Sequence, residues 1–239
     1  FSIAQKIEGL NKNTGVHPSG IAISNREMSE ICPMQRTPEG NLITGYDMNW
    51  VAELMVKFDI LGLRTLSVIY DVCDTLDIDI YNVDLNDVEI YKPLQNLENP
   101  HGLFQIEAET NFRVCQKIKP KSIEELSAVI AIARPGALEF ADSYAEYVKT
   151  SNFQSIHPFF DDVLDYTGGI PLYQEQLMKM AVKVGFSLDE SEQLRRIVGK
   201  KKVEKMAEWQ KKIDAKIKEN DLPIEVGEIL WKVAEDSAN

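Results

Sequence analysis

Residues 51–66 read VAELMVKFDILGLRTL, and apolar and charged side chains alternate in the middle of this stretch. Side chains two residues apart in a β-strand share a face. Lys57 and Asp59 are therefore expected to stand side by side on one face of a strand. The other face would pack against a core through three apolar side chains: Val56, Phe58 and Ile60.

The end of this strand has the chemistry of a candidate site. A carboxylate next to a lysine and before a glycine turn can hold a divalent cation and a phosphate together, which makes Asp59 and Lys57 candidates. A surface ion pair on a half-buried strand is the alternative. Gly62 ends the alternation, and a helix is predicted from the spacing of the next apolar residues: Leu66, Ile69, Val72 and Cys73.

Composition limits the class of protein. The chain has 239 residues, 44% of them hydrophobic, and a formal net charge of -12. It has no apolar run near the roughly 20 residues of a membrane helix, and its first residues lack the pattern of a signal peptide. We expect a cytoplasmic protein of one large or two small domains, without a membrane partner. Its three cysteines have no CxxC spacing and predict reduced thiols.

The charge is polarised along the chain. Residues 195–218 hold ten lysines or arginines and three acidic residues, whereas residues 74–98 hold seven acidic residues and one lysine. This distribution suits a protein that contacts DNA with one surface. The acidic segment lacks the DxDxDG spacing of a calcium loop. It is interpreted as a connector with short extended pieces, and a domain boundary is placed near its end.

Residues 1–50 predict a short helix, a loop, a strand at 21–23 and a second loop marked by Pro33, Pro38 and Gly40. The first loop, GVHPSG, has glycines at both ends that would let backbone N–H groups approach an anion. The simpler interpretation is a turn, and on residue types alone it is favoured. His17 is nevertheless kept as a candidate phosphate neighbour.

Helical patterns dominate from residue 101 onward. Ser122 with Glu125 forms a capping box, and the helix that follows must end near Arg134 because Pro135 comes next. Arg134 would reach outward from that helix end, either toward a ligand or only toward the helix dipole. A second helix is expected from Tyr173 to Gly185, with four residues on its apolar side: Leu177, Met178, Ala181 and Val184.

A third helix is predicted from the capping box of Ser187 and Glu190 to Gly199. Arg195, Arg196 and Lys200 would gather near its end. Arginine offers a fork of N–H donors and lysine a compact charge, and both suit a polyphosphate or a DNA backbone. A fourth helix would begin in the run 200–202. Taken alone, such a run of lysines is usually a solvated charged face. The residues of that helix expected to pack inward are Val203, Met206, Ile213 and Ile217.

Several motifs together resemble the alpha subunit of bacterial DNA polymerase III, a C-family replicative polymerase. KFDILGLRTL resembles the KFDFLGL-like palm motif of that family, and the other matches follow in the same order. They cover nearly the whole chain: GVHPSG at 15–20, GLFQIEAE at 102–109, ARPGAL at 133–138, YQEQLMKMA at 173–181 and LRRIVGKKK at 194–202. Departures at Pro18, Ala137 and Pro171 indicate a divergent branch, of bacterial or phage origin.

The resemblance implies an α+β fold that is mainly helical. Residues 1–98 would be the C-terminal part of a nucleotidyltransferase-like palm with a connector, and residues 99–239 a truncated all-helical fingers domain. It implies transfer of a dNTP to a primer 3'-OH with two Mg2+ ions, one of them liganded by Asp59. The other metal ligands would lie outside this segment, so the isolated chain is expected to be inactive.

The resemblance also implies roles for the candidate residues. Asp59 and Lys57 would be catalytic. The nucleotide phosphates would be bound by Arg134, Arg195, Arg196, Lys200 and His17, and DNA by Lys201, Lys202 and Arg64. The implied partners are primer-template DNA, dNTP, the remainder of the polymerase or a split partner, a sliding clamp and other replisome proteins. A non-catalytic DNA- or nucleotide-binding module is the alternative.

Overall fold

The computed structural model describes residues 2–10, 13, 15–199 and 203–236. The fold is α+β and mainly helical, as predicted, and the four short strands of these described residues all lie before residue 60. Contacts within the chain separate a first unit, Phe1–Ile80, from a second, Tyr81–Asn239. No helix in the described ranges is long and apolar enough to cross a membrane.

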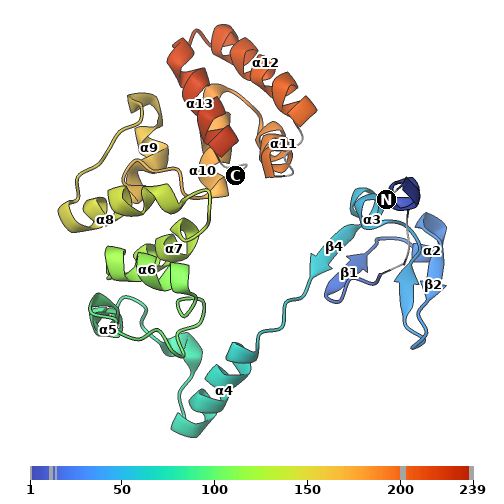
Figure 1. Ribbon diagram of the computed structural model, residues 1–239, viewed down its shortest axis with the longest axis horizontal. Helices are drawn as coiled ribbons and strands as arrows, with labels where there is room; N and C mark the ends of the chain where they lie inside the picture. Colours follow the sequence, from blue (N-terminus) through green and yellow to red (C-terminus); the bar gives the residue numbers. More distant parts are fainter. Residues whose placement is uncertain (1, 11–12, 14, 200–202, 237–239) are drawn as a thin grey trace. The chain divides into compact units, whose positions relative to one another are not determined.

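The first unit contains two small antiparallel sheets (Figure 1). Strand β1 (Gly20–Ile23) pairs with β4 (Val56–Asp59), and β2 (Met34–Arg36) pairs with β3 (Leu42–Thr44). A small core of Cys32, Val51 and Met55 lies within this unit. Its four helices are α1 (Ser2–Ile7), α2 (Met28–Ile31), α3 (Met48–Leu54) and α4 (Arg64–Leu76).

The prediction that Val56, Phe58 and Ile60 face a core is wrong. They are 59%, 54% and 63% exposed. Phe58 lies opposite Ile21 and Val56 opposite Ile23 across the β1–β4 pair, so four apolar side chains share one uncovered face. The alternation correctly separated the two faces of the strand. It could not show that, within the described residues of the first unit, no element covers this apolar face.

The second loop predicted for residues 1–50 contains a hairpin. Strands β2 and β3 flank a tight turn, in which Thr37 N donates to Asn41 O at 2.9 Å and Gly40 N donates to Thr37 O at 2.9 Å. Gly40 has φ +89°, a conformation that glycine adopts without a steric cost. Pro38 and Gly40 therefore mark a turn between strands, and the three-residue strands are too short for an alternation pattern to reveal.

The extended pieces predicted in the acidic segment are also wrong, because this segment forms tight helical turns. Asp84 accepts from the backbone N–H of Asn86, and Asp87 accepts from that of Glu89, each at 2.9 Å. Aspartate side chains favour such local bonds over a strand ladder. Asp87 thereby caps η2 (Val88–Tyr91). The other helical turns of the segment are η1 (Ile80–Asn82) and α5 (Lys92–Gln95).

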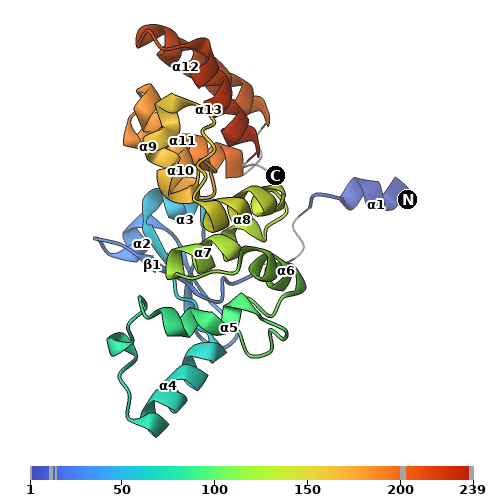
Figure 2. The ribbon, with the colours of Figure 1, turned by 90° about the vertical axis from the view of Figure 1, so that its left-hand side faces the viewer.

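In the described residues of the second unit all regular elements are helices or 3-10 turns joined by loops, as Figures 1 and 2 show. One core joins α5 to α8, and another joins α9 to α13. The α-helices that complete this unit are α6 (Glu109–Ile118), α7 (Ile123–Ile132), α8 (Ala141–Thr150), α9 (Asp161–Leu164), α10 (Gln174–Val184), α11 (Leu188–Gly199), α12 (Val203–Glu219) and α13 (Ile224–Asp236). The 3-10 turns are η3 (Leu138–Phe140), η4 (Pro158–Phe160) and η5 (Asp165–Thr167).

The predicted helix boundaries that fall within the described residues are confirmed, and the start of a fourth helix predicted in the run 200–202 lies outside them. Ser122 caps α7 by accepting from Glu125 N at 3.2 Å, and α7 ends two residues before Arg134. Helix α10 follows Tyr173 and ends at Gly185. The capping box before α11 is reciprocal: Glu190 N donates to Ser187 Oγ at 3.2 Å, and Ser187 N donates to Glu190 Oε2 at 2.8 Å. Local capping chemistry therefore sets where these helices begin.

The predicted apolar faces are largely confirmed. Leu177, Ala181 and Val184 are buried on α10, while the deepest methionine of that helix is Met180 and not Met178. On α12, Ile213 and Ile217 are buried as expected, together with Trp209. The side chains of Val203 and Met206 lie outside what the structure describes. The cysteines are free thiols, as predicted: Cys32, Cys73 and Cys115.

Candidate functional site

The end of β4 carries the ion pair that the alternation predicts. Lys57 Nζ lies 2.5 Å from Asp59 Oδ1 and 2.8 Å from Asp59 Oδ2, so the ammonium contacts both carboxylate oxygens. The side chain of Lys57 is 20% exposed and that of Asp59 is 45% exposed. Lysine is thus the more enclosed partner, and the carboxylate keeps access to solvent.

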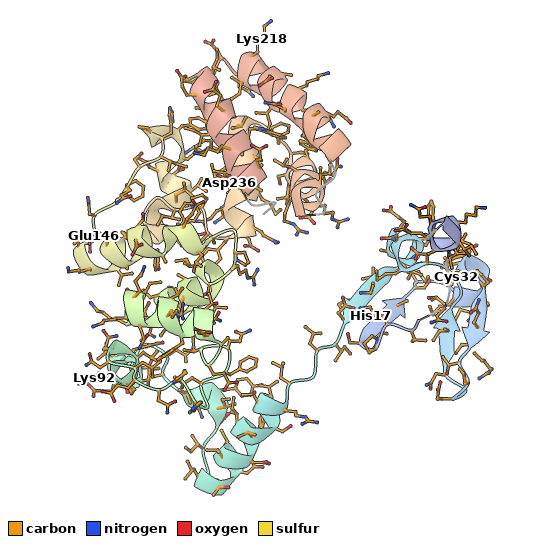
Figure 3. The ribbon with its side chains drawn as sticks, viewed as in Figure 1. His17, Cys32, Lys92, Glu146, Lys218 and Asp236 are labelled. Carbon is orange, nitrogen blue, oxygen red and sulfur yellow. The ribbon has the colours of Figure 1, made fainter. Side chains whose placement is uncertain are left out.

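His17 joins this pair from the loop before β1. Its Nε2 lies 3.8 Å from Asp59 Oδ1, and its Nδ1 accepts from Ser19 N at 3.3 Å. Figure 3 shows His17 next to β1. The pairing of Gly20 with Asp59 brings the loop and the end of β4 to the same place. The structure therefore brings together three of the predicted site residues.

Gly20 makes this approach possible. A Cβ added at position 20 would lie 2.9 Å from Nδ1 of His17 and 3.1 Å from Cε of Lys57. A Cβ atom essentially never comes within 3.0 Å of another heavy atom, so a larger residue would displace the ring. The histidine and the lysine side chain thus converge over a position that has no side chain of its own.

The surroundings keep Asp59 ionised. Its hydrogen bond from Lys57 lowers the pKa of its carboxyl, and the charges of Lys57 and His17 act in the same direction. The group remains open to solvent, so the effect comes from its partners and not from burial. An ionised, accessible carboxylate is the form that a cation or a polar ligand can approach.

A pocket adjoins this site within the first unit. Its volume is about 390 Å³, and Gly20, His17 and Lys57 form part of its wall. Three methionines and Tyr46 line the same pocket, so most of its wall is apolar. The methionines are Met28, Met34 and Met48. The site thus has a charged rim beside an apolar hollow.

At this site the described residues offer one carboxylate for a magnesium ion. Asp59 provides carboxylate oxygens, the donors that Mg2+ prefers, whereas His17 provides nitrogen. Within the described ranges, no three His, Cys, Asp or Glu side chains gather closely enough to hold a metal ion. The donor chemistry of Asp59 fits one position in the shell of such an ion, and the remaining ligands would have to come from other residues.

A second cluster lies where the first residue of α10 meets the C-terminal half of α11. Arg195 donates to both carboxylate oxygens of Glu192 at 2.6 Å, and Arg196 Nε donates to Glu192 Oε1 at 2.8 Å. Arg195 Nη1 also donates to Gln174 Oε1 at 2.9 Å. The predicted arginine pair is therefore organised by an acid and an amide that sequence reasoning did not select.

Glu192 is strongly perturbed by this arrangement. The hydrogen bond from Arg195, followed by that from Arg196, lowers the pKa of the Glu192 carboxyl from 4.5 to about 2. Glu192 in turn raises the pKa of Arg195. Its spacing of three and four residues before the arginines is the signal that could have identified it from sequence. The partnership with Gln174 crosses between helices and leaves no such local signal.

Gln176 is another residue that the sequence left unassigned. It is fully buried, and its Oε1 accepts from the backbone N–H groups of Leu172 at 2.8 Å and Tyr173 at 2.9 Å. Its Nε2 donates to Thr167 Oγ1 at 2.7 Å. This network fixes the turn that enters α10, and with it the position of Gln174.

Within the described residues, no side-chain hydrogen bond or ion pair joins the remaining candidates to either cluster. Arg134 is exposed in the turn after α7, where its carbonyl accepts from Ala137 N and Leu138 N, each at 3.0 Å. Arg64 is exposed at the first position of α4. Lys200, Lys201 and Lys202 lie outside the described residues. The two clusters, around Asp59 and around Glu192, belong to different units.

Comparison with known proteins identifies the family. The family model for the bacterial DNA polymerase III alpha subunit finger domain matches residues 65–221, and that for the bacterial DNA polymerase III alpha NTPase domain matches residues 1–62. The first covers more than half of the chain. The Asp59 cluster falls in the NTPase-domain match, and the Glu192 cluster falls in the finger-domain match.

Curated relatives agree with this assignment. The DNA polymerase III subunit alpha of Thermus aquaticus is 33% identical over 100% of this chain, and that of Aquifex aeolicus is 34% identical over 99%. The Bacillus subtilis protein of the same name is 33% identical over 85% of this chain. The chain spans about a fifth of the length of these relatives, 21%, 21% and 19% respectively. The chain therefore belongs to the bacterial DNA polymerase III alpha subunit family.

Proposed function

We propose that this chain is part of a replicative DNA-directed DNA polymerase that extends a primer with dNTPs. The observation that carries the proposal is the Asp59 cluster. An ionised and accessible carboxylate stands at the end of β4, with lysine against it, inside the region matched by the NTPase-domain model. The Glu192 cluster supplies the cationic side chains that such a reaction needs.

The reaction proposed is nucleotidyl transfer. The primer 3'-oxygen forms a bond to the α-phosphorus of a dNTP, the bond from that phosphorus to the β-phosphate oxygen breaks, and pyrophosphate leaves. Bound Mg2+ would make the attacking hydroxyl more acidic and neutralise phosphate charge. Asp59 is the ligand that this chain contributes to one of two such ions.

The cations of the first unit act on the nucleotide in this proposal. Lys57 orients the carboxylate of Asp59 and, as a point charge, faces the phosphates of the nucleotide. His17 lies at the rim of the same site and donates to a phosphate oxygen. Both contacts stabilise negative charge that develops during transfer.

The cations of the second unit bind the triphosphate and DNA in this proposal. Arg195, Arg196 and Lys200 form the group that binds the triphosphate, and Arg134 gives a further phosphate contact. The residues proposed to contact the DNA backbone are Arg64, Lys201 and Lys202. Base pairing and not a base-reading side chain would select the nucleotide.

The proposed setting is that of a replicative enzyme. Primer-template DNA and dNTP are the substrates, and the partners are the remaining polymerase segments, a sliding clamp and other replisome proteins in the cytoplasm. We propose a domain boundary at 98/99 between palm and fingers. A single catalytic carboxylate does not organise two metal ions, so the isolated chain is expected not to extend a primer.

The test measures the affinity of the chain for primer-template DNA with and without a matching dNTP and Mg2+. We expect nucleotide and metal together to tighten binding, and Asp59→Asn to abolish that gain. Asp71→Asn, an exposed aspartate on α4, is the matched control and keeps the gain. If the affinity for DNA is the same with and without nucleotide and metal, the chain is instead a non-catalytic DNA-binding module. Primer extension by the isolated chain that depends on Asp59 would refute its expected inactivity.

A further inference from the structure

Arg195 and Arg196 are adjacent in sequence but have different surroundings. The side chain of Arg195 is 31% exposed, and that of Arg196 is 66% exposed. Arg195 uses Nε, Nη1 and Nη2 in hydrogen bonds, while Arg196 uses only Nε among the contacts of the described residues. The two guanidinium groups are therefore not equivalent donors.

The contacts of Arg195 tie two helices together. One edge of its guanidinium is held by Glu192 on α11, and Nη1 reaches Gln174 at the first position of α10. Gln174 is itself well placed, because buried Gln176 fixes the backbone directly before it. A guanidinium that is hydrogen-bonded from two helices has little freedom to reorient toward a ligand.

Arg196 presents the opposite situation. Glu192 holds its Nε, which orients the guanidinium, and within the described part of the chain neither terminal amino group has a hydrogen-bond partner. Four N–H donors of a positively charged group thus remain open to solvent. This is the donor pattern that binds a phosphate oxygen pair.

We propose that Arg195 is a positioning residue, fixed between Glu192 and Gln174, and that the terminal amino groups of Arg196 contact the triphosphate. The inference rests on the proposed function, because it assigns separate tasks within the triphosphate-binding group. Arg195 holds α11 against the start of α10 and shares Glu192 with Arg196. Arg196 is thereby held in an orientation that suits a polyphosphate before one arrives.

The test uses inorganic tripolyphosphate as the probe and calorimetry of the whole chain at several salt concentrations. The experimental variants are Gln174→Met and Arg196→Met. Gln193→Met, an exposed glutamine on α11, is the matched control. Gln174→Met carries no charge change, so it removes the support of Arg195 without altering long-range electrostatics. Each affinity is measured well below the unfolding temperature of its variant.

We expect Gln174→Met to weaken tripolyphosphate binding about tenfold, because Arg195 and, through Glu192, Arg196 are then no longer fixed in the orientation that binds the anion. The dependence on salt should be unchanged. Arg196→Met should weaken binding by a similar factor and also flatten the salt dependence, because a charge that contacts the anion is gone. Gln193→Met should bind like the wild type.

Two results would overturn the inference alone. The first is a Gln174→Met variant that binds like the wild type. The second is a Gln174→Met variant that loses salt dependence as Arg196→Met does. If the wild-type chain fails to bind tripolyphosphate, or if Arg196→Met binds as tightly as the wild type, the proposed triphosphate site on α11 is itself wrong.

Discussion

Lys57 Nζ contacts both carboxylate oxygens of Asp59, at 2.5 Å and 2.8 Å, across one face of β4. The two residues are separated by Phe58, whose side chain points to the opposite face. A strand therefore places the cation and the anion next to each other without any help from a loop. The pair lowers the pKa of the Asp59 carboxyl, and a substitution of Lys57 can test this effect.

Lys57→Met should raise the pKa of the Asp59 carboxyl toward its ordinary value. The hydrogen bond and the charge of Lys57 both lower that pKa in the wild type, and methionine has neither. A titration of the carboxyl carbon of Asp59 by NMR measures the change. The matched control is Lys92→Met, which removes an exposed partner of Glu89 in the other unit. An Asp59 titration that is the same in the wild type and in Lys57→Met would contradict this account.

Gly20→Ala should displace the ring of His17. The new methyl group would lie 2.9 Å from Nδ1 of His17, which is too close for the ring to stay. The imidazole resonances of His17 in an NMR spectrum report this displacement. Gly15→Ala is the control, since a methyl group there meets nothing within 4 Å. Unchanged His17 resonances in Gly20→Ala would show that the ring does not lie over position 20.

Gln176→Met should lower the free energy of unfolding by about 2 kcal/mol or more. Methionine fills the space but leaves the partly buried N–H groups of Leu172 and Tyr173 without an acceptor. Urea unfolding measures the loss. Gln193→Met makes the same chemical change on an exposed face of α11 and should stay within about 0.5 kcal/mol of the wild type. Equal effects of the two substitutions would mean that the buried network does not stabilise the fold.

Glu192 should make stability depend on pH in the acid range. The carboxyl has a pKa of about 2 in the folded chain and an ordinary value near 4.5 when unfolded. Its stabilising effect is therefore complete above about pH 4.5 and is lost as the pH falls from there to about 2. Urea unfolding at pH 7 and at pH 3 should show a smaller difference for Glu192→Gln than for the wild type. Glu235→Gln controls for the loss of one exposed negative charge, and an identical difference for Glu192→Gln and wild type would contradict the prediction.

The elements predicted correctly are those with local signals. Ser122 and Ser187 predict helix starts because each forms a capping box with the glutamate three positions later. Gly185 predicts the end of α10. The ion pair of Lys57 and Asp59 follows from the two-residue period of a strand. In each case the information lies within a few residues of chain, which is what periodicity and capping rules can use.

The features that were missed depend on partners distant in sequence or on burial. Gln174 looks like an ordinary polar residue at a helix start until Arg195, 21 positions later, reaches it. Gln176 becomes a buried hub only because Thr167 and the turn before α10 close around it. For Phe58 the alternation gave the correct face of the strand, but it did not show that this face is exposed to solvent. Sequence patterns assign a face to a side chain but not the element that covers it.

The β1–β4 pair has a further consequence for samples of this chain. Each of its strands has one hydrogen-bonded neighbour among the described residues, so the outer edges keep backbone groups that another strand could bind. The apolar face next to those edges adds a hydrophobic drive for the same contact. At high protein concentration this small sheet is where copies of the chain would begin to aggregate.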